Sequence, residues 1–184
     1  MPSPSEALFA ALFDAHFDAI LAYARRRTDQ LSDAEDVTAD TFTVVWRRME
    51  HLPTDTSAQL PWLYGIARRV VSNQRRTMAR RQRLLDRLRS ALVLHRSPTS
   101  ETDIAGAMAA LRPADQEILR LAAWEGLRHA EIALALDITP NAAAIRLHRA
   151  RRRLSAVMKG SALTRTSAGW KGTVSAVNHG DEPR

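Results

Sequence analysis

The chain has 184 residues, of which 45% are hydrophobic, so it is long enough to form one ordinary domain or two small ones with a packed core. It carries 27 lysines and arginines against 20 aspartates and glutamates, and this net charge of +7 favours a polyanionic partner, either nucleic acid or an anionic membrane surface. The absence of cysteine excludes disulfides, thiolate metal sites and a cysteine nucleophile.

The N-terminal segment is expected to form an amphipathic helix of a cytoplasmic protein. Apolar residues recur at steps of three and four, which places them on one helix face: Phe9, Phe13, Phe17, Ile20 and Ala24. Acidic residues interrupt the segment, and it lacks the basic start of a secretory signal. We expect no apolar run in the chain to approach the roughly 18 residues that a membrane span requires.

A second helix is expected to start at Ser32 or Asp33, because Ser32 can cap a helix and acidic residues suit its positive end. Asp33, Asp36 and Asp40 follow at spacings that place their carboxylates on one face. An acidic helix face usually contacts only solvent, but in a strongly basic chain it is also a plausible binding surface for a protein partner. Trp46, at the end of this helix, fits a core position and an interface anchor equally well.

A loop is expected from His51 to Leu60, followed by a third helix from about Pro61 to near Arg89, since proline disfavours helix at the residue before it. An apolar stripe on this helix favours a core position for Trp62 over a base-stacking role. The other faces carry side chains that could follow the phosphates of one strand: Arg68, Arg69, Asn73, Arg76 and Arg80.

Polar, proline-containing residues from Arg96 to Asp103 indicate a linker between two helical units. Pro113 is expected at the first position of the next helix, and Gly126 just past its end. After Gly160 the pattern gives way to small and polar residues, and we expect a disordered tail.

The strongest local pattern is AEIALALDITPNAAAIRLHRARRRL, from Ala130 to Leu154. A short helix with Ile132, Ala133 and Leu136 on its inner face is followed by a turn at Asp137 and Ile138. Thr139 then caps a second helix that starts with Pro140 and presents Ala143 and Leu147 inward. This order predicts a helix-turn-helix, whose second helix enters the major groove of DNA.

The outward residues of that second helix are the candidates for reading DNA. Five lie where they could reach base edges: Asn141, Ala144, Ile145, His148 and Arg149. Four more arginines extend the positive face and suit phosphates: Arg146, Arg151, Arg152 and Arg153. The alternative is a basic amphipathic helix on the surface of a bundle, which the cap, proline and turn spacing make less favourable.

Three stretches resemble, in the same order, the bacterial RNA polymerase sigma factors of the extracytoplasmic-function type. One family helix docks on the clamp helices of the polymerase, and it is resembled by DAEDVTADTFTVVWRRM. The family helix that faces the minus-ten promoter element is resembled by PWLYGIARRVVSNQRR. The stretch from LRPADQEIL to RARRRL resembles the family's region 4, which reads the minus-thirty-five element. The resemblance covers residues 7 to 158.

This resemblance implies an all-α fold of two small helical domains joined by a flexible linker. The expected boundaries are 1–90 for the region 2 bundle, 91–103 for the linker, 104–159 for the region 4 helix-turn-helix and 160–184 for the disordered tail. It implies three partners: core RNA polymerase, promoter DNA and an anti-sigma factor. No cofactor, metal, membrane insertion or covalent chemistry is expected.

The resemblance also assigns roles to residues. The acidic face with Trp46 would bind core polymerase, and the cationic side of the third helix would bind the minus-ten element. The loop before that helix resembles one that captures a flipped base, which points to Thr54 and Asp55. The chain departs from the family pattern at three places. Arg128 replaces a Ser or Thr that caps the first helix of the helix-turn-helix. Two departures bear on the preferred promoter sequence: Ala144 and Ile145 replace a cation followed by Ser, and Arg69 replaces Asn.

Two other classes of protein are less consistent with the sequence. A conventional regulator could carry the same C-terminal motif, but it would not need the acidic and Arg-rich helices in this order. A DNA-processing enzyme would need a nucleophile within a catalytic fold, and no strand-rich segment or paired carboxylates with a base are found. The six histidines are scattered without metal-ligand spacing.

Overall fold

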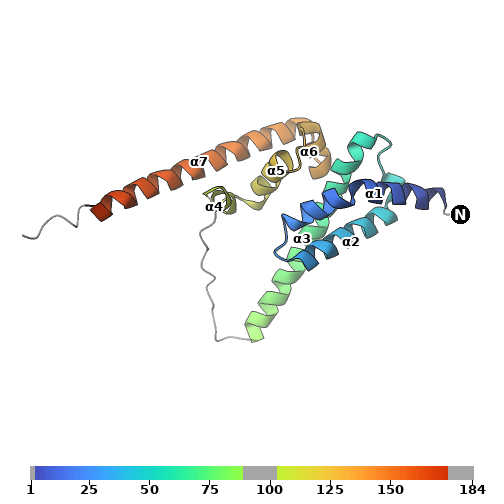
Figure 1. The fold of residues 1–184 in the computed structure, drawn as a ribbon, viewed down its shortest axis with the longest axis horizontal. Coiled ribbons are helices and arrows are strands. Elements are labelled where there is room, and N and C mark those ends of the chain that lie inside the picture. Colours follow the sequence, from blue (N-terminus) through green and yellow to red (C-terminus); the bar gives the residue numbers. More distant parts are fainter. Residues whose placement is uncertain (1–2, 89–102, 174–184) are drawn as a thin grey trace, which may run out of the picture. The chain divides into compact units, whose positions relative to one another are not determined.

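The computed structural model describes residues 3–88 and 103–173, and all regular secondary structure in these ranges is helical (Figure 1). The all-α expectation is thus confirmed. The helices are α1 (Pro4–Arg25), α2 (Leu31–Arg47), the 3-10 turn η1 (Met49–His51), α3 (Thr56–Leu88), α4 (Asp103–Ala109), α5 (Pro113–Ala123), α6 (His129–Leu136) and α7 (Pro140–Thr173).

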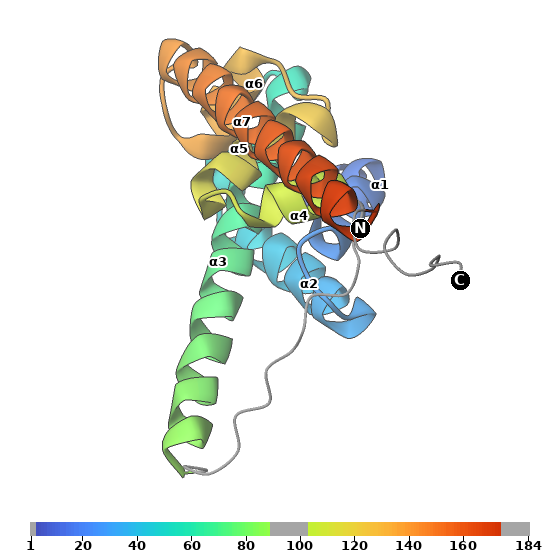
Figure 2. The ribbon, with the colours of Figure 1, turned by 90° about the vertical axis from the view of Figure 1, so that its left-hand side faces the viewer.

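The helices divide between two compact units. The first contains α1, α2, α3, α6 and the start of α7, and the second contains α4, most of α5 and α7 from Ile145 onward. Within the first unit, α1, α2 and α3 pack on one another, and α6 packs on α3. The C-terminal part of α3 projects beyond α1 and α2 (Figure 2). The predicted linker falls largely on residues 89–102, outside the described residues, and the domain boundaries stay a prediction.

The core of the first unit confirms the predicted apolar spacing of α1. A capping box opens α1, in which the Ser3 backbone N–H donates to the Glu6 carboxylate over 2.6 Å and the Ser3 hydroxyl accepts from the Glu6 N–H. The phenylalanines of α1 gather around Phe42 of α2, with ring centroids 4.7 Å apart for Phe13 and Phe42. The fully buried side chains deeper in the unit include Ile20, Tyr23, Val37, Val45 and Leu63.

Helix α1 corrects one expectation about the sequence. An 18-residue window within its 22 residues reaches a mean hydropathy of 1.4, so by length and composition the helix could cross a membrane, although no run of that length was expected. Its acidic residues are too few and too widely spaced to lower the average over 18 residues. In the structure this helix packs against α2 and α3.

Two helix starts also differ from their predicted positions. Helix α2 begins at Leu31 after Gln30, without a side-chain cap, so Ser32 lies inside the first turn. Helix α3 begins at Thr56, and Pro61 lies within it. The reason is the Asp55 carboxylate, which accepts the Ser57 backbone N–H over 2.9 Å and starts the helix before the proline. The loop is therefore shorter than predicted.

The turns around α5, α6 and α7 follow the prediction closely. Pro113 begins α5, and Gly126 has a φ of 68°, although the helix itself ends at Ala123. Asp137 adopts a left-handed conformation after α6, which aspartate tolerates better than most residues. The Thr139 hydroxyl accepts from the Ala142 N–H over 3.2 Å and so caps α7.

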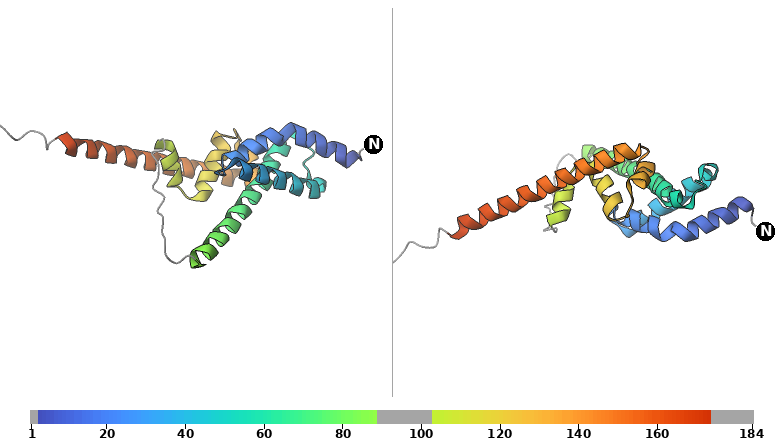
Figure 3. Two further views of the ribbon diagram at one scale, coloured as in Figure 1. Left: turned by 60° about the horizontal axis from the view of Figure 1, so that its bottom comes forward. Right: turned by 90° about the horizontal axis from the view of Figure 1, so that it is seen from above.

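Helix α7 continues past the point where disorder was expected. It runs as one helix from Pro140 to Thr173 (Figure 3), thirteen residues beyond Gly160. Five of these thirteen residues are alanine, leucine, lysine or arginine, and they extend a helix that is already formed, which costs less than starting a new one. The last residues of the predicted tail, 174–184, lie outside the described residues.

Candidate functional site

The acidic side chains of α2 gather on one face, as predicted. Asp36 and Asp40 are exposed and Asp33 is half-buried beside them. Trp46 does not share this face, because at 3.6 residues per turn it lies about 80° to 120° around the helix from the two exposed carboxylates. Its ring packs edge-on against Phe9 at 5.2 Å while 45% of the residue remains exposed. Trp46 therefore combines a structural contact with an exposed surface.

The cationic side of α3 forms a regular stripe. Residues at spacings i, i+4, i+7 and i+11 share one face of a helix, and the four members of this α3 polar stripe are exposed: Arg69, Asn73, Arg76 and Arg80. An Arg76 nitrogen donates to Asn73 Oδ1 over 2.8 Å. Arg68 lies off the stripe and is half-buried, and its Nε has no hydrogen-bond partner among the described residues. It is placed less well than the other four to meet DNA.

The two loop residues predicted to capture a base have different roles in the structure. The Asp55 carboxylate accepts the Ser57 hydroxyl over 2.8 Å as well as the Ser57 N–H, and these hydrogen bonds lower the pKa of Asp55. This carboxylate is committed to capping α3. Thr54 is exposed just before it. An aspartate two residues before a serine is a sequence signal for such a cap, which the prediction did not use.

The recognition candidates on α7 also sort by face. Opposite the buried Ala143, Leu147 and Ala150, four exposed residues form an α7 outer stripe: Asn141, Ile145, His148 and Arg152. Arg149 lies beside this stripe and is exposed, and Arg146 and Arg151 flank it on opposite sides. Ala144 is half-buried, so it is poorly placed to touch a base.

Arg153 contributes to structure and not to the outer face. Its NH1 group contacts both carboxylate oxygens of Asp115, at 2.8 and 2.7 Å, within the second unit. The Asp115 side chain is only 12% exposed, against 48% for Arg153. The expectation that Arg153 serves phosphates alongside its neighbours is therefore not supported by its placement.

We expect Arg153→Ala to lower the free energy of unfolding by about 2 kcal/mol, because it leaves a largely buried carboxylate without its charged donor. The matched control is Arg152→Ala, which removes the same charge from the exposed adjacent position and should stay within about 0.5 kcal/mol of the wild type. Urea unfolding followed by circular dichroism measures both. Equal stability of the two variants would contradict the structural role of Arg153.

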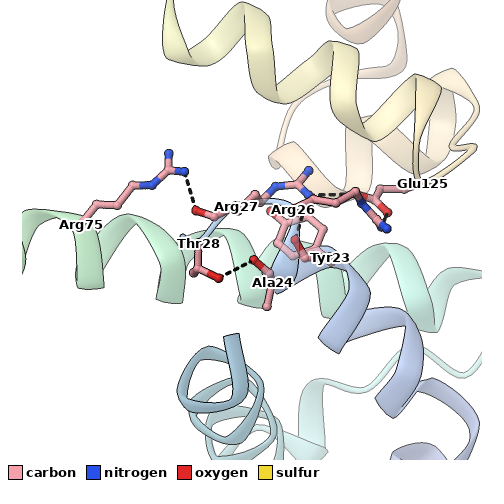
Figure 4. A network of polar contacts seen from close by, with 7 residues as sticks. All are labelled: Tyr23, Ala24, Arg26, Arg27, Thr28, Arg75 and Glu125. Carbon is pink, nitrogen blue, oxygen red and sulfur yellow. Dashed lines mark hydrogen bonds and ion pairs between the residues drawn. The ribbon is translucent and has the colours of Figure 1, made fainter. Parts of the chain in front are cut away.

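The structure also reveals a buried charged cluster that the sequence did not predict (Figure 4). The Arg27 NH1 group lies 2.9 Å from Glu125 Oε1, and both side chains are 1% exposed. The Arg27 guanidinium also stacks on the Tyr23 ring at 3.5 Å, and Arg26 pairs with the same Glu125 carboxylate. Because Arg27 and Glu125 are 98 residues apart, no local pattern could pair them.

The cluster has two further neighbours on α3. An Arg75 nitrogen donates to the Arg27 carbonyl oxygen over 2.7 Å. Burial, and then the negative charge of Glu125, raise the pKa of Tyr64 to about 12, although Arg26 and Arg27 oppose this shift. The Tyr64 hydroxyl therefore stays protonated at neutral pH beside the ion cluster.

Helix α6 approaches the α3 backbone at Gly65. A Cβ atom at Gly65 would lie 3.1 Å from the Ala135 carbonyl oxygen, closer than side chains normally pack. Nearby, Arg69 of the α3 polar stripe contacts the Asp137 carboxylate at 3.3 Å. At the start of α6, the Glu131 carboxylate accepts the Arg128 N–H over 2.6 Å and the Arg128 guanidinium over 2.9 Å, which lowers the pKa of Glu131. Glu131 thereby stabilises a helix start that lacks a capping hydroxyl.

Comparison with known proteins supports the sequence resemblance. The family profile "Sigma-70 region 2" matches residues 12–82, and "Sigma-70, region 4" matches residues 101–154. The ECF RNA polymerase sigma factor SigL of Mycobacterium tuberculosis is 28% identical over 166 residues, 86% of this chain and 93% of that protein. The RNA polymerase sigma factor NccH of Alcaligenes xylosoxydans xylosoxydans is 27% identical over 83% of this chain and 88% of its own length.

Solved structures share the fold. The sigma factor RpoE of Bartonella quintana, in complex with the anti-sigma factor NepR, is 21% identical, with a TM-score of 0.58 over 82% of this chain and 96% of that one. CnrH, in complex with the cytosolic domain of CnrY, is 24% identical, with a TM-score of 0.56 over 83% and 88%. Since both sigma-70 profiles match in their family order and the relatives span most of its length, this chain belongs to the sigma-70 family as a sigma factor of the extracytoplasmic-function type.

Proposed function

We propose that the acidic face of α2 binds core RNA polymerase and that the exposed, arginine-bearing faces of α3 and α7 bind promoter DNA. The observation that carries this proposal is the segregation of charge by helix. Exposed carboxylates lie on α1 and α2, whereas exposed arginines gather on α3 and α7. A protein that bound only a polyanion would not need the acidic face of α2. A protein that bound only another protein would not need the exposed arginines of α3 and α7.

The proposed contacts divide by promoter element. Core polymerase meets Asp33, Asp36, Asp40 and Trp46. The minus-ten element meets the α3 polar stripe, with Arg68, Thr54 and Asp55 as more peripheral candidates. The minus-thirty-five element meets Asn141, Ala144, Ile145, Arg146, His148, Arg149, Arg151 and Arg152.

These contacts contribute in different ways. Arginine–phosphate pairs supply most of the affinity and make it depend on salt, because each releases condensed counterions. Specificity comes from side chains at base edges: Arg149 can contact a guanine with two hydrogen bonds, and Ile145 suits the methyl group of thymine. Thr54 can hydrogen-bond an unstacked base, while the capping carboxylate of Asp55 holds the loop in place.

We further propose that the protein acts in the cytoplasm by binding alone, without covalent chemistry. An anti-sigma factor is its expected regulator, because a solved structure of the same fold contains a sigma factor in complex with an anti-sigma factor. We also keep the division into residues 1–90 and 104–159 as two modules, which the spans of the two family profiles support.

Run-off transcription tests the proposal. Core polymerase from the host is incubated with and without the protein on a pool of genomic fragments that includes DNA upstream of its own gene. We expect transcripts of defined length only when both proteins are present. If the protein binds duplex DNA tightly by itself and does not co-migrate with core polymerase, a conventional regulator is the better description and the proposal is wrong.

A further inference from the structure

We propose that Asp115 limits how tightly the helix-turn-helix holds DNA of any sequence, because its carboxylate keeps Arg153 from the phosphates. This inference rests on the proposed function of α7 as a DNA-binding helix. Both residues belong to the second compact unit, with Asp115 in the first turn of α5 and Arg153 near the middle of α7. Asp115 acts through Arg153 and does not touch DNA itself.

Arg153 shares one flank of α7 with two other arginines. This α7 basic flank consists of Arg146, Arg149 and Arg153, which follow one another at i, i+3 and i+7. At 3.6 residues per turn, the three lie within about 60° of one another around the helix. Arg149 is the candidate for a base edge, and arginines before and after it on the same flank suit neighbouring phosphates. By position alone, Arg153 would be the second phosphate contact of this flank.

The carboxylate of Asp115 removes Arg153 from that role. One guanidinium nitrogen of Arg153 donates to both carboxylate oxygens, at 2.8 and 2.7 Å. The Asp115 side chain is only 12% exposed, so the surrounding protein holds the carboxylate in place. The pair carries no net charge, and a phosphate that approached Arg153 would also approach the negative charge of Asp115. Paired in this way, Arg153 displaces few counterions from DNA.

The pairing is selective within α7. Among the α7 side chains that the structure describes, Arg153 is the only arginine in an ion pair. Its side chain is still 48% exposed, so it lies near enough to the surface to meet a phosphate once the carboxylate is neutralised. One buried acidic residue therefore removes a single cation from a helix that is otherwise open to DNA.

The withheld cation affects binding to all sequences. Contacts to phosphates carry no sequence information, so they strengthen binding to promoter and non-promoter DNA alike. Differences in affinity between variants of one interface arise mostly from the rate of dissociation. Asp115 therefore shortens the time that the helix-turn-helix spends on DNA without a promoter.

The salt dependence of binding to non-promoter DNA tests this role. The full chain is titrated into a fluorescent duplex of arbitrary sequence, between about 50 and 200 mM salt. In Asp115→Asn, the slope of log affinity against log salt should steepen by about 0.9, the value for one added phosphate contact. Over this range the variant should lose about 3.5-fold more affinity than the wild type. Equal slopes in the two proteins would overturn the proposal.

Two controls separate the released charge from a loss of stability. Asp115→Asn combined with Arg153→Gln also lacks the ion pair but releases no cation, so its slope should return to that of the wild type. Asp14→Asn makes the same change in net charge at an exposed position of α1 and should leave the slope unchanged. A slope that stays steep in the double variant would contradict the role of Arg153. If circular dichroism shows that Asp115→Asn loses helicity, Asp115→Leu makes the same test with a better helix former.

Arg146→Ala distinguishes failure of this inference from failure of the proposed function. Arg146 is exposed at the start of the α7 basic flank, and its loss should make the slope shallower by about 0.9. If Arg146→Ala has this effect and Asp115→Asn has none, α7 binds DNA but Asp115 does not control it. If neither variant changes the slope, the DNA-binding role of α7 is wrong as well.

Discussion

Reversing two charges on α2, with Asp36→Arg and Asp40→Arg together, is expected to weaken binding to core polymerase by about a hundredfold. Both side chains are exposed on one face of the helix, so the change replaces attraction by repulsion at a complementary surface. Neither carboxylate lies in the buried core, and the fold should survive. Titration of labelled protein with core polymerase at two salt concentrations measures the loss, which should shrink at high salt.

The matched control reverses two exposed carboxylates on α1, Asp14→Arg and Asp18→Arg, and so makes the same change in net charge on a different helix. If the loss came only from the more positive chain, both double variants would bind equally weakly. Equal affinity of the α2 variant and the wild type would show that the acidic face is merely solvated. A third variant, Trp46→Ala, reports separately on the adjacent aromatic surface.

Arg149→Ala is expected to reduce transcription from promoters that depend on the minus-thirty-five element by about tenfold. Arg149 is exposed beside the α7 outer stripe, where a guanidinium can donate two hydrogen bonds to one guanine. Such a contact discriminates between bases by roughly 1–3 kcal/mol, and a loss near the lower end of this range lowers the affinity for the matched promoter about tenfold. Single-round transcription on matched templates with and without the upstream element gives the ratio directly.

Two comparisons show whether Arg149 reads a base or a phosphate. Arg149→Lys keeps the charge but loses the two-pronged geometry, so it should behave like Arg149→Ala if the contact is with a base. Arg151→Ala, on a flank of the stripe, should weaken all upstream sequences alike and lower the salt dependence of binding. Undiminished transcription by Arg149→Ala on the complete promoter would refute its assignment.

Local patterns in the sequence predicted much of the fold. The apolar spacing of α1, the proline that starts α5 and the threonine that caps α7 each act within a few residues, so they can be interpreted without the rest of the chain. The same holds for the stripes on α3 and α7, because helical spacing alone decides which side chains share a face. Where the prediction placed helix starts wrongly, as at Thr56, a competing local cap outweighed a proline.

The contacts that the sequence could not predict are those between distant segments. Arg27 belongs to a run of three arginines at the end of α1, and such a run normally indicates a solvated helix end. Only the folded chain shows that one of these arginines is buried against Tyr23 and Glu125. Likewise, Arg153 is one of three consecutive arginines, and only its distance to Asp115 separates it from its neighbours.

The close approach at Gly65 has a consequence for how such a chain diverges. An added Cβ atom would meet the Ala135 carbonyl oxygen at 3.1 Å, so even alanine would require a small shift of α6, and a larger side chain would require a greater one. In related chains that keep α6 packed this closely on α3, residue 65 should therefore stay glycine. Where a larger residue stands at that position, we expect α6 to lie farther from α3.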